Sequence, residues 1–125
     1  MKEILVAEDG AKAIGPYSQG IKAGDTYYFS GILGLDPKTN EFTGPTLAEQ
    51  TRQVLANMDA VLKAAGLTKE NVVKTTVFVR DMSRFAEVNQ IYGEYFNENP
   101  PARTCVEVSN LPKNGLVFMD CIAVK

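Results

Sequence analysis

The 125-residue chain contains no histidine and no tryptophan, and it has only two cysteines. Without histidine, it lacks the commonest general base and the commonest side-chain ligand for transition metals. No Ser-His or Cys-His pair is available, so any acid or base has to be Asp, Glu, Tyr, Cys or Lys. Two cysteines without histidine are a poor basis for a zinc site. We therefore expect no metal centre and no metal catalysis.

Long apolar runs and an excess of basic residues are also missing. No segment approaches the length needed to cross a bilayer, and the N-terminus carries no apolar stretch of signal-peptide length. A formal net charge of −2 gives no basic footprint for a nucleic-acid backbone. Cys105 and Cys121 have no framework spacing, so we expect free thiols. These features predict a cytoplasmic protein that binds no membrane, and they disfavour nucleic-acid binding without excluding a local basic patch.

Glycine-rich cofactor motifs are absent as well. The ten glycines form neither a G-x-G-x-x-G fingerprint nor a Walker pattern, so no nucleotide cofactor is expected. The chain is long enough for one hydrophobic core, and no segment has the composition of a linker. We expect a single domain over residues 1–125 that works without a cofactor.

The first half of the chain predicts a hairpin followed by a helix. Residues 20–23 and 27–30 are strand-like and are joined by Gly24-Asp25, a two-residue hairpin signal. A capping-box pattern begins a helix at Thr46, and an apolar stripe at helical spacing continues to Gly66. Glycine suits the left-handed residue that follows many helices.

The second half predicts a second helix among further strands. The helix is expected from about 84 to 96, because the prolines that follow disfavour its continuation. The β-branched run at 72–79 carries apolar residues on both faces, which predicts a central strand buried on both sides. Two helices cover only one face of a sheet, so a partner subunit is expected on the other. Two more strands, at 104–109 and 116–124, are expected to be joined by a turn at Asn114-Gly115.

Arg103 and Cys105 are the first candidate site residues. Strand side chains alternate, so Arg103, Cys105 and Glu107 are expected on one face of a well-packed strand. A guanidinium beside a thiol suits bidentate binding of a small carboxylate or phosphate. The ordinary alternative places Arg103 at a strand edge, paired with Glu107 or another carboxylate. On this segment alone the alternative is favoured.

Asn89 and Tyr17 are the other unusual positions. Asn89 lies four residues after Phe85 and three before Tyr92, on the aromatic face of the second helix. A buried amide needs a hydrogen-bond partner, either a backbone group or a ligand. The loop at 14–19, Ile-Gly-Pro-Tyr-Ser-Gln, reads by itself as an ordinary turn that carries Tyr17.

In their order and spacing, these segments resemble the Rid family, also called the YjgF family, of reactive-intermediate imine and enamine deaminases, which includes endoribonuclease L-PSP-like proteins. The resemblance implies a chorismate-mutase-like α+β subunit, with two helices on one face of a mixed sheet. It also implies a homotrimer whose ligand sites lie in clefts between subunits. The matching runs are 14–19, 30–31, 72–79, 85–89 and 101–108.

The resemblance assigns roles to particular residues. In similar proteins the arginine at the position of Arg103 binds the carboxylate of a 2-imino acid. Water then attacks the C=N carbon, which releases ammonia and leaves a 2-oxo acid without any cofactor. The rest of the pocket is expected to come from backbone groups near Gly31 and Cys105 and from the side chains of Tyr17, Ser30 and Asn89.

Phe118 departs from the family pattern. The deaminases carry a glutamate at this position of the last strand, where it positions the attacking water. Asp120 shares the strand face of Phe118, but it lies about 6.6 Å further along and its side chain is shorter. Many members also have Gln and Pro in the segment after Gly31, where this chain has Ile32-Leu33-Gly34. The arginine that is expected to bind the carboxylate is retained, whereas the group that would transfer the proton of the attacking water is not identified.

Three functions therefore remain. The first is hydrolysis of 2-imino acids such as 2-iminobutanoate or 2-iminopropanoate, with Arg103, Tyr17 and Asp120 as catalytic candidates and Phe118 in the pocket. The second is a regulator that binds 2-oxo acids without turnover. The third is an RNA-acting translation inhibitor, which the acidic balance and the missing histidine disfavour.

Overall fold

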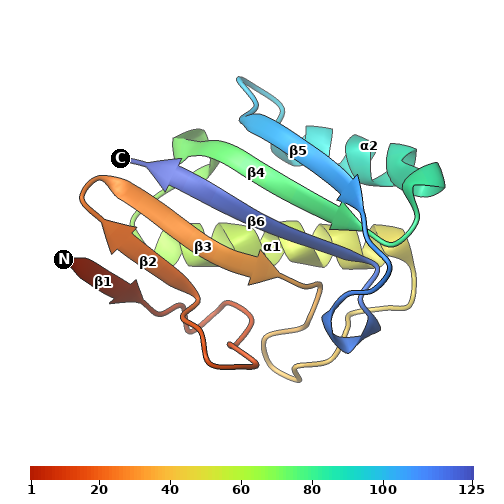
Figure 1. Cartoon of the computed structure of the whole chain (residues 1–125), viewed down its shortest axis with the longest axis horizontal. Coiled ribbons are helices and arrows are strands. Elements are labelled where there is room, and N and C mark those ends of the chain that lie inside the picture. Colours follow the sequence, from red (N-terminus) through yellow and green to blue (C-terminus); the bar gives the residue numbers. More distant parts are fainter.

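Six strands form one mixed sheet in the computed structural model, which describes residues 1–125 (Figure 1). Their order across the sheet is β1-β2-β3-β6-β4-β5. Only the β4–β5 pair is parallel, and the other four pairs are antiparallel. The strands are Lys2–Leu5 (β1), Gly20–Ala23 (β2), Thr26–Ile32 (β3), Val72–Val79 (β4), Ala102–Glu107 (β5) and Val117–Val124 (β6).

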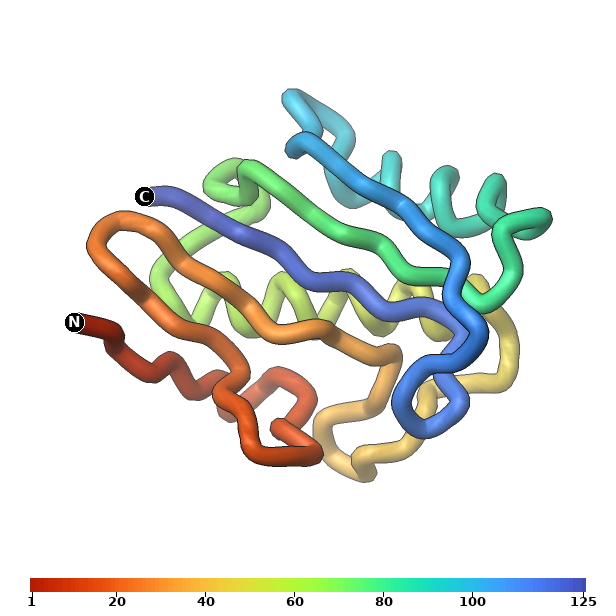
Figure 2. Tube along the Cα trace, viewed as in Figure 1, coloured from red at the N-terminus to blue at the C-terminus, as the bar shows by residue number.

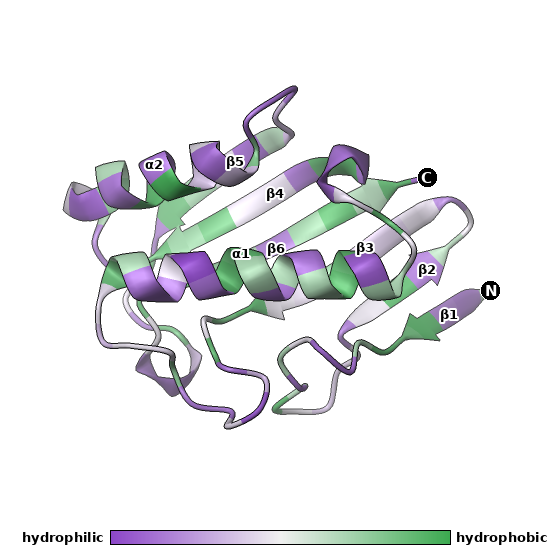
Figure 3. Ribbon diagram, turned by 180° about the vertical axis from the view of Figure 1, so that it is seen from behind, coloured by the Kyte–Doolittle hydropathy of each residue, from purple (hydrophilic) through white to green (hydrophobic).

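Two α-helices, α1 (Leu47–Ala64) and α2 (Phe85–Tyr95), lie on one face of this sheet (Figure 3). The hydroxyl of Thr46 accepts a hydrogen bond from the Glu49 amide at 3.2 Å and caps the start of α1. Just beyond its end, Gly66 has a φ of +76°. The predicted α+β architecture and both helices are therefore confirmed to within a few residues. Neither helix is long and apolar enough to span a bilayer.

The hydrophobic core fills the space between the helices and the sheet. Val54 and Met58 of α1 meet Val77 of β4 and Met119 of β6, and all four side chains are fully buried. Each such side chain contributes about 1.5–3 kcal/mol by leaving water.

The opposite face of the sheet is covered by no part of the chain (Figure 1). Ile4, Ile21, Tyr28 and Ile122 are successive cross-strand partners from β1 to β6, so their side chains share this face. Tyr28 is 48% exposed. An apolar row of this kind is typical of a surface that meets another subunit, and a partner subunit on this face stays a prediction. The number of subunits stays a prediction.

The pairing of the last strands differs from the prediction. β5 and β6 do not form a hairpin, because β6 inserts between β3 and β4 while β5 lies at the sheet edge beside β4 (Figure 2). A 3-10 turn at Pro112–Asn114 precedes β6, and Lys113 and Asn114 both have positive φ. The strand that carries Arg103 is therefore an exposed edge strand rather than a well-packed one.

Two further strand predictions need correction. β4 is not buried on both sides, since its second face is the open face of the sheet. A register shift between Val72 and Lys74 also turns Val72 into the core, 5% exposed, and leaves Val73 at the surface, 48% exposed. Strand β1 was not predicted, because its largely exposed residues show no alternating apolar pattern.

Candidate functional site

Arg103 lies on the helix side of the edge strand β5. Its guanidinium carbon is 5.1 Å from the ring centre of Phe85 and 4.8 Å from that of Tyr92, both on α2. Its Nη1 donates a hydrogen bond to Asn89 Oδ1 at 2.8 Å. Two aromatic rings and an amide therefore fix the orientation of the guanidinium.

Asn89 is exposed, not buried among aromatic side chains as predicted. The reason is that α2 faces the outermost strand of the sheet, where no further element covers the amide. The amide of Asn89 accepts from the side chain of Arg103, whereas the helix pattern suggested a backbone group or a ligand as its partner. Even so, the structure brings together two residues that the sequence singled out separately.

No carboxylate neutralises Arg103. The four ion pairs of the structure involve other residues, and the Glu107 carboxylate accepts from the Met82 amide at 2.8 Å instead. The ordinary alternative is therefore confirmed for the strand-edge position of Arg103 and wrong for its ion pair with Glu107 or a neighbouring acid. The remaining N–H groups of the guanidinium donate no hydrogen bond within the chain and are available to a planar anion.

Cys105 follows Arg103 on the same face of β5 and is half-buried. Burial raises the pKa of its thiol, and the positive charge of Arg103 lowers it by a smaller amount. The thiol is therefore protonated near neutral pH and is a weak nucleophile. Nowhere in the structure do three acidic or cysteine side chains gather closely enough to hold a metal ion.

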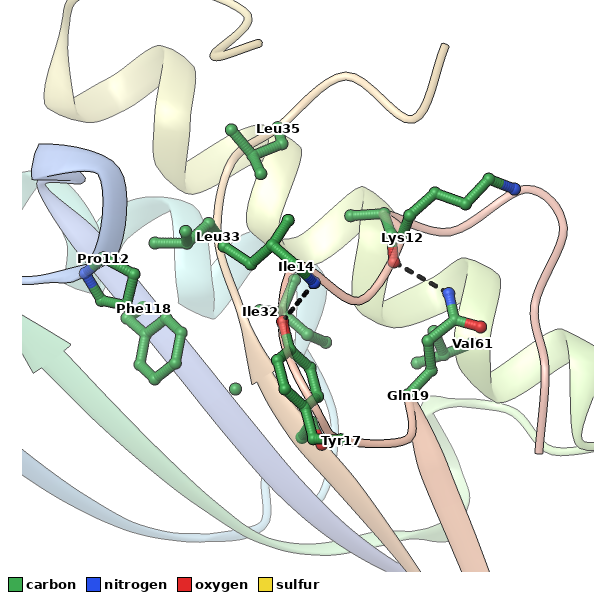
Figure 4. Close-up of a pocket in the computed structure, with 13 residues that line it drawn as sticks. Lys12, Ile14, Tyr17, Gln19, Ile32, Leu33, Leu35, Val61, Pro112 and Phe118 are labelled. Atoms are coloured by element: carbon green, nitrogen blue, oxygen red, sulfur yellow. Dashed lines mark hydrogen bonds between the residues drawn. The ribbon is translucent and has the colours of Figure 1, made fainter. Parts of the chain in front are cut away.

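Tyr17, Ser30, Gly31 and Phe118 form a second cluster, at the end of β3 and the start of β6 (Figure 4). The Ser30 hydroxyl donates to the carbonyl of Ser18 at 2.6 Å. The Tyr17 hydroxyl accepts from the amide of Ile14 at 3.1 Å. The first hydrogen bond holds the loop at 14–19 against β3, and the second closes the loop on itself.

The ring of Phe118 packs directly on the backbone of Gly31. A Cβ atom at Gly31 would clash with three atoms of the ring, so only glycine allows this approach. Phe118 also contacts Phe78 across the strands, with ring centres 5.8 Å apart. The wall beside Gly31 is therefore aromatic, and Asp120, although on the same strand face as Phe118, does not line the pocket.

A pocket of about 440 Å³ opens beside this cluster. Its floor is buried and apolar, and Ile14 at its mouth is 42% exposed. The change to Ile32-Leu33 after Gly31 is visible in the sequence, but the floor as a whole is not, because its buried residues come from two separate segments, the run at 32–35 and Val61 of α1. The lining residues beyond the second cluster are Ala11, Lys12, Ile14, Gln19, Ile32, Leu33, Leu35, Val61 and Pro112.

The two clusters do not meet within one copy of the chain. Arg103 is on β5, whereas Gly31 is on β3, three positions away across the sheet. At strand spacings of about 4.8 Å, the two strands are roughly 14 Å apart. Moreover, Arg103 faces the helices, while Phe118 faces the open side. One copy therefore holds two separate clusters of candidate residues, one with a guanidinium that has no carboxylate partner and one with an apolar pocket.

Fold and geometry together define a class: small two-layer α+β proteins with a ligand-sized pocket at the end of the sheet. Comparison with known proteins makes the assignment specific. The family model for endoribonuclease L-PSP matches residues 8–125. The chain belongs to the Rid/YjgF/RutC family.

Individual relatives agree with this assignment along the whole chain. A RutC family protein of Pyrococcus horikoshii is 49% identical over 125 residues, which cover 100% of this chain and 99% of the relative. The chloroplastic Reactive Intermediate Deaminase A of Arabidopsis thaliana is 44% identical over 98% of this chain and 65% of its own length.

Solved structures share the fold. The YjgF protein of E. coli has a TM-score of 0.94 and 42% identity, with 98% of each chain covered. E. coli TdcF, solved with bound serine, has a TM-score of 0.94 and 35% identity, again with 98% of each chain covered.

Proposed function

We propose that the protein hydrolyses 2-imino acids, such as 2-iminobutanoate or 2-iminopropanoate, to 2-oxo acids and ammonia. The observation that carries the proposal is the guanidinium of Arg103, held between two rings and free of any carboxylate partner. The deaminase name of the Arabidopsis relative and the serine bound to TdcF support it, because an amino acid has the same carboxylate as an imino acid.

The complete site forms between copies in a homotrimer. The open apolar face needs a cover, and each copy carries both halves of a site that it cannot close by itself. Arg103, with Asn89 and Cys105, comes from one subunit. Tyr17, Ser30, Gly31 and Phe118 come from the next. This arrangement explains why a free cation and a free pocket occur on the same chain.

The reaction then follows from positioning. Arg103 binds the carboxylate through two parallel hydrogen bonds, which fixes the plane of the imine. Water adds to the C=N carbon, the nitrogen takes up protons, and ammonia leaves as the C=O bond forms. Of the two side-chain hydroxyls that line the pocket, Tyr17 keeps an uncommitted proton, because Ser30 already donates to Ser18. Imines hydrolyse in water without help, so modest positioning is sufficient.

A binder of 2-oxo acids without turnover is the second candidate. The specific observation that favours it is Phe118, whose ring fills the place where a water-positioning carboxylate is expected. Such a protein would use the same guanidinium and the same pocket.

A coupled assay separates the two. An amino-acid oxidase generates 2-iminobutanoate, and semicarbazide traps whatever imine remains. A deaminase lowers semicarbazone formation below the level in buffer. A pure binder leaves that level unchanged and still binds 2-oxobutanoate in calorimetry. A protein that does neither contradicts both candidates, and salt-dependent RNA binding in its place would favour the RNA-acting function.

A further inference from the structure

The pocket beside Phe118 carries information about the substrate side chain. Building on the function proposed above, we infer that the site selects 2-imino and 2-oxo acids with extended apolar side chains, such as those derived from norleucine or leucine. Shorter acids, such as 2-iminobutanoate, are accepted less well. The inference rests on the size of the pocket, on its walls and on the state of its polar groups.

The pocket is large for a short substrate. Its volume of about 440 Å³ lies within the range of about 300–1,000 Å³ that is typical of small-molecule sites. The ethyl group of 2-iminobutanoate would leave most of this space unfilled. A longer chain reaches the floor of Leu33, Leu35 and Val61, all of them buried.

The walls are apolar where the substrate chain has to pass. Eight of the thirteen lining residues are hydrophobic, and the outer end of the Phe118 ring packs against Gly31. Figure 4 shows Phe118 and Pro112 on one side of the pocket and Ile14 and Tyr17 facing them. A methylene chain that lies between these groups leaves water and packs against carbon atoms on both sides.

The partly buried polar side chains of the lining, Gln19 and Ser30, already have hydrogen-bond partners within the chain. The Gln19 amide donates to the carbonyls of Ala7 and Ala11 and accepts from the Ala7 amide. The Ser30 hydroxyl donates to Ser18. Lys12, the one charged residue of the lining, is exposed and lies 3.9 Å from a carboxylate oxygen of Glu8. The two donors of the lining that remain, the Lys12 ammonium and the Tyr17 hydroxyl, are both exposed, so no polar group awaits a substrate chain at the buried floor.

The expected orientation of the substrate places its carboxylate at the mouth of the pocket. Arg103 of the neighbouring subunit has to approach from the open face, where Gly31 and Phe118 lie. The carboxylate then points outward to that guanidinium, and the side chain points inward along Phe118. Phe118 is thus a residue that determines specificity, in addition to its effect on the water.

The test is calorimetric binding of a homologous series: pyruvate, 2-oxobutanoate, 2-oxopentanoate and 2-oxohexanoate. Each added methylene should tighten binding about fourfold, the factor that corresponds to burial of one CH₂ group. 2-Oxoglutarate, of similar length but with a charged end, should bind no better than 2-oxobutanoate. Equal affinity along the series would overturn the inference and leave the proposed function intact. Tightest binding of 2-oxoglutarate would overturn it as well, and absence of any binding would overturn both.

Matched variants locate the effect. Phe118→Ala should reduce the gain per methylene, while Phe78→Ala should keep it, because Phe78 shares the open face with Phe118 but does not line the pocket. Ile14→Ser supplies an independent test, since Ile14 lies on an exposed loop and its loss should not affect folding. An unchanged gain in affinity per methylene in both Phe118→Ala and Ile14→Ser would show that the side chain of the ligand lies elsewhere.

Discussion

At the scale of single residues, Arg103 owes its position to uncharged neighbours. Stacking on Phe85 and Tyr92 and a hydrogen bond to Asn89 orient the guanidinium without neutralising it. An ion pair would have fixed it equally well but would compete with a ligand carboxylate. A cation that is oriented but not neutralised is suited to binding an anion from outside the chain.

Arg103→Lys should weaken binding of 2-oxobutanoate by about 1.5–3 kcal/mol while the fold persists. An ammonium group keeps the charge but loses the planar pair of donors and the stacking. Calorimetry on both proteins measures the difference. Arg52→Lys is the matched control, because Arg52 forms an exposed pair with Glu94 and lies in neither half of the site. Equal affinity of Arg103→Lys and the parent would remove Arg103 from the site.

Phe118→Glu should raise imine turnover, by up to the roughly 10²–10⁴-fold that general acid–base help supplies. The half-buried ring borders the pocket, so a glutamate there has access to solvent and need not enter a sealed core. The coupled imine assay and a thermal melt should be run on the same preparation. A folded variant that is no faster than an active parent would show that water is handled by Tyr17, Asp120 or backbone groups.

Because the thiol of Cys121 is buried, we expect the protein to lose stability at high pH. Burial, and secondarily the negative charge of Asp120, raises the pKa of its thiol from 9.0 to about 12. Because the unfolded thiol ionises first, its contribution to stability is intact below pH 9 and declines as the pH rises toward 12. The decline is at most about 1.4 kcal/mol per pH unit. Urea denaturation of Cys121→Ala and the parent from pH 8 to 11 should show a shallower fall for the variant.

At the scale of elements, a buried hydrogen bond joins α2 to the sheet. The hydroxyls of Tyr92 and Thr75 lie 2.7 Å apart, and neither residue is more than slightly exposed. The same Tyr92 ring supports Arg103 on its other side. The Tyr92 side chain therefore contributes both to the packing of α2 on β4 and to the orientation of the Arg103 guanidinium.

Tyr92→Phe should lower the free energy of unfolding by about 1–3 kcal/mol, since the Thr75 hydroxyl loses its buried partner. The ring remains, so binding of 2-oxobutanoate should change little. Urea denaturation measures the first effect and calorimetry the second. Tyr28→Phe, at an exposed tyrosine of the open face, should leave stability within about 0.5 kcal/mol. An unchanged stability of Tyr92→Phe would mean that Thr75 finds another partner.

At the scale of the whole molecule, the open sheet face and the divided site lead to the same expectation. The protein should sediment as a trimer of about three times 13.7 kDa. Ile122→Glu, which places a charge in the middle of the open face, should dissociate it and abolish ligand binding, although Arg103 and the pocket are untouched. Val6→Glu, at an exposed position outside the sheet, is the control.

Mixing variants tests whether the site is shared between subunits. Arg103→Ala and Tyr17→Ala should each bind poorly alone. Mixed trimers formed by unfolding and refolding the two together contain some interfaces with both halves intact, so part of the binding should return. A stable monomer at micromolar concentration, or mixed trimers without recovered binding, would contradict a site between subunits.

The sequence by itself determined the helices, the first hairpin and the family. The cap at Thr46, the left-handed Gly66 and the Gly24-Asp25 turn act over a few residues, so local pattern is enough to predict them. The candidate residues of both clusters were also found from sequence. Their order along the chain matches the family, and side-chain chemistry can be read without coordinates.

Only the tertiary structure decided how these parts are placed. The insertion of β6 between β3 and β4 moved Arg103 to an exposed edge, turned Asn89 outward and separated the guanidinium from the pocket. Strand pairing joins residues far apart in sequence, and alternation along one strand does not specify its neighbours. For the same physical reason, the apolar pocket floor, assembled from the run at 32–35 and from Val61 of α1, became visible only in the folded chain.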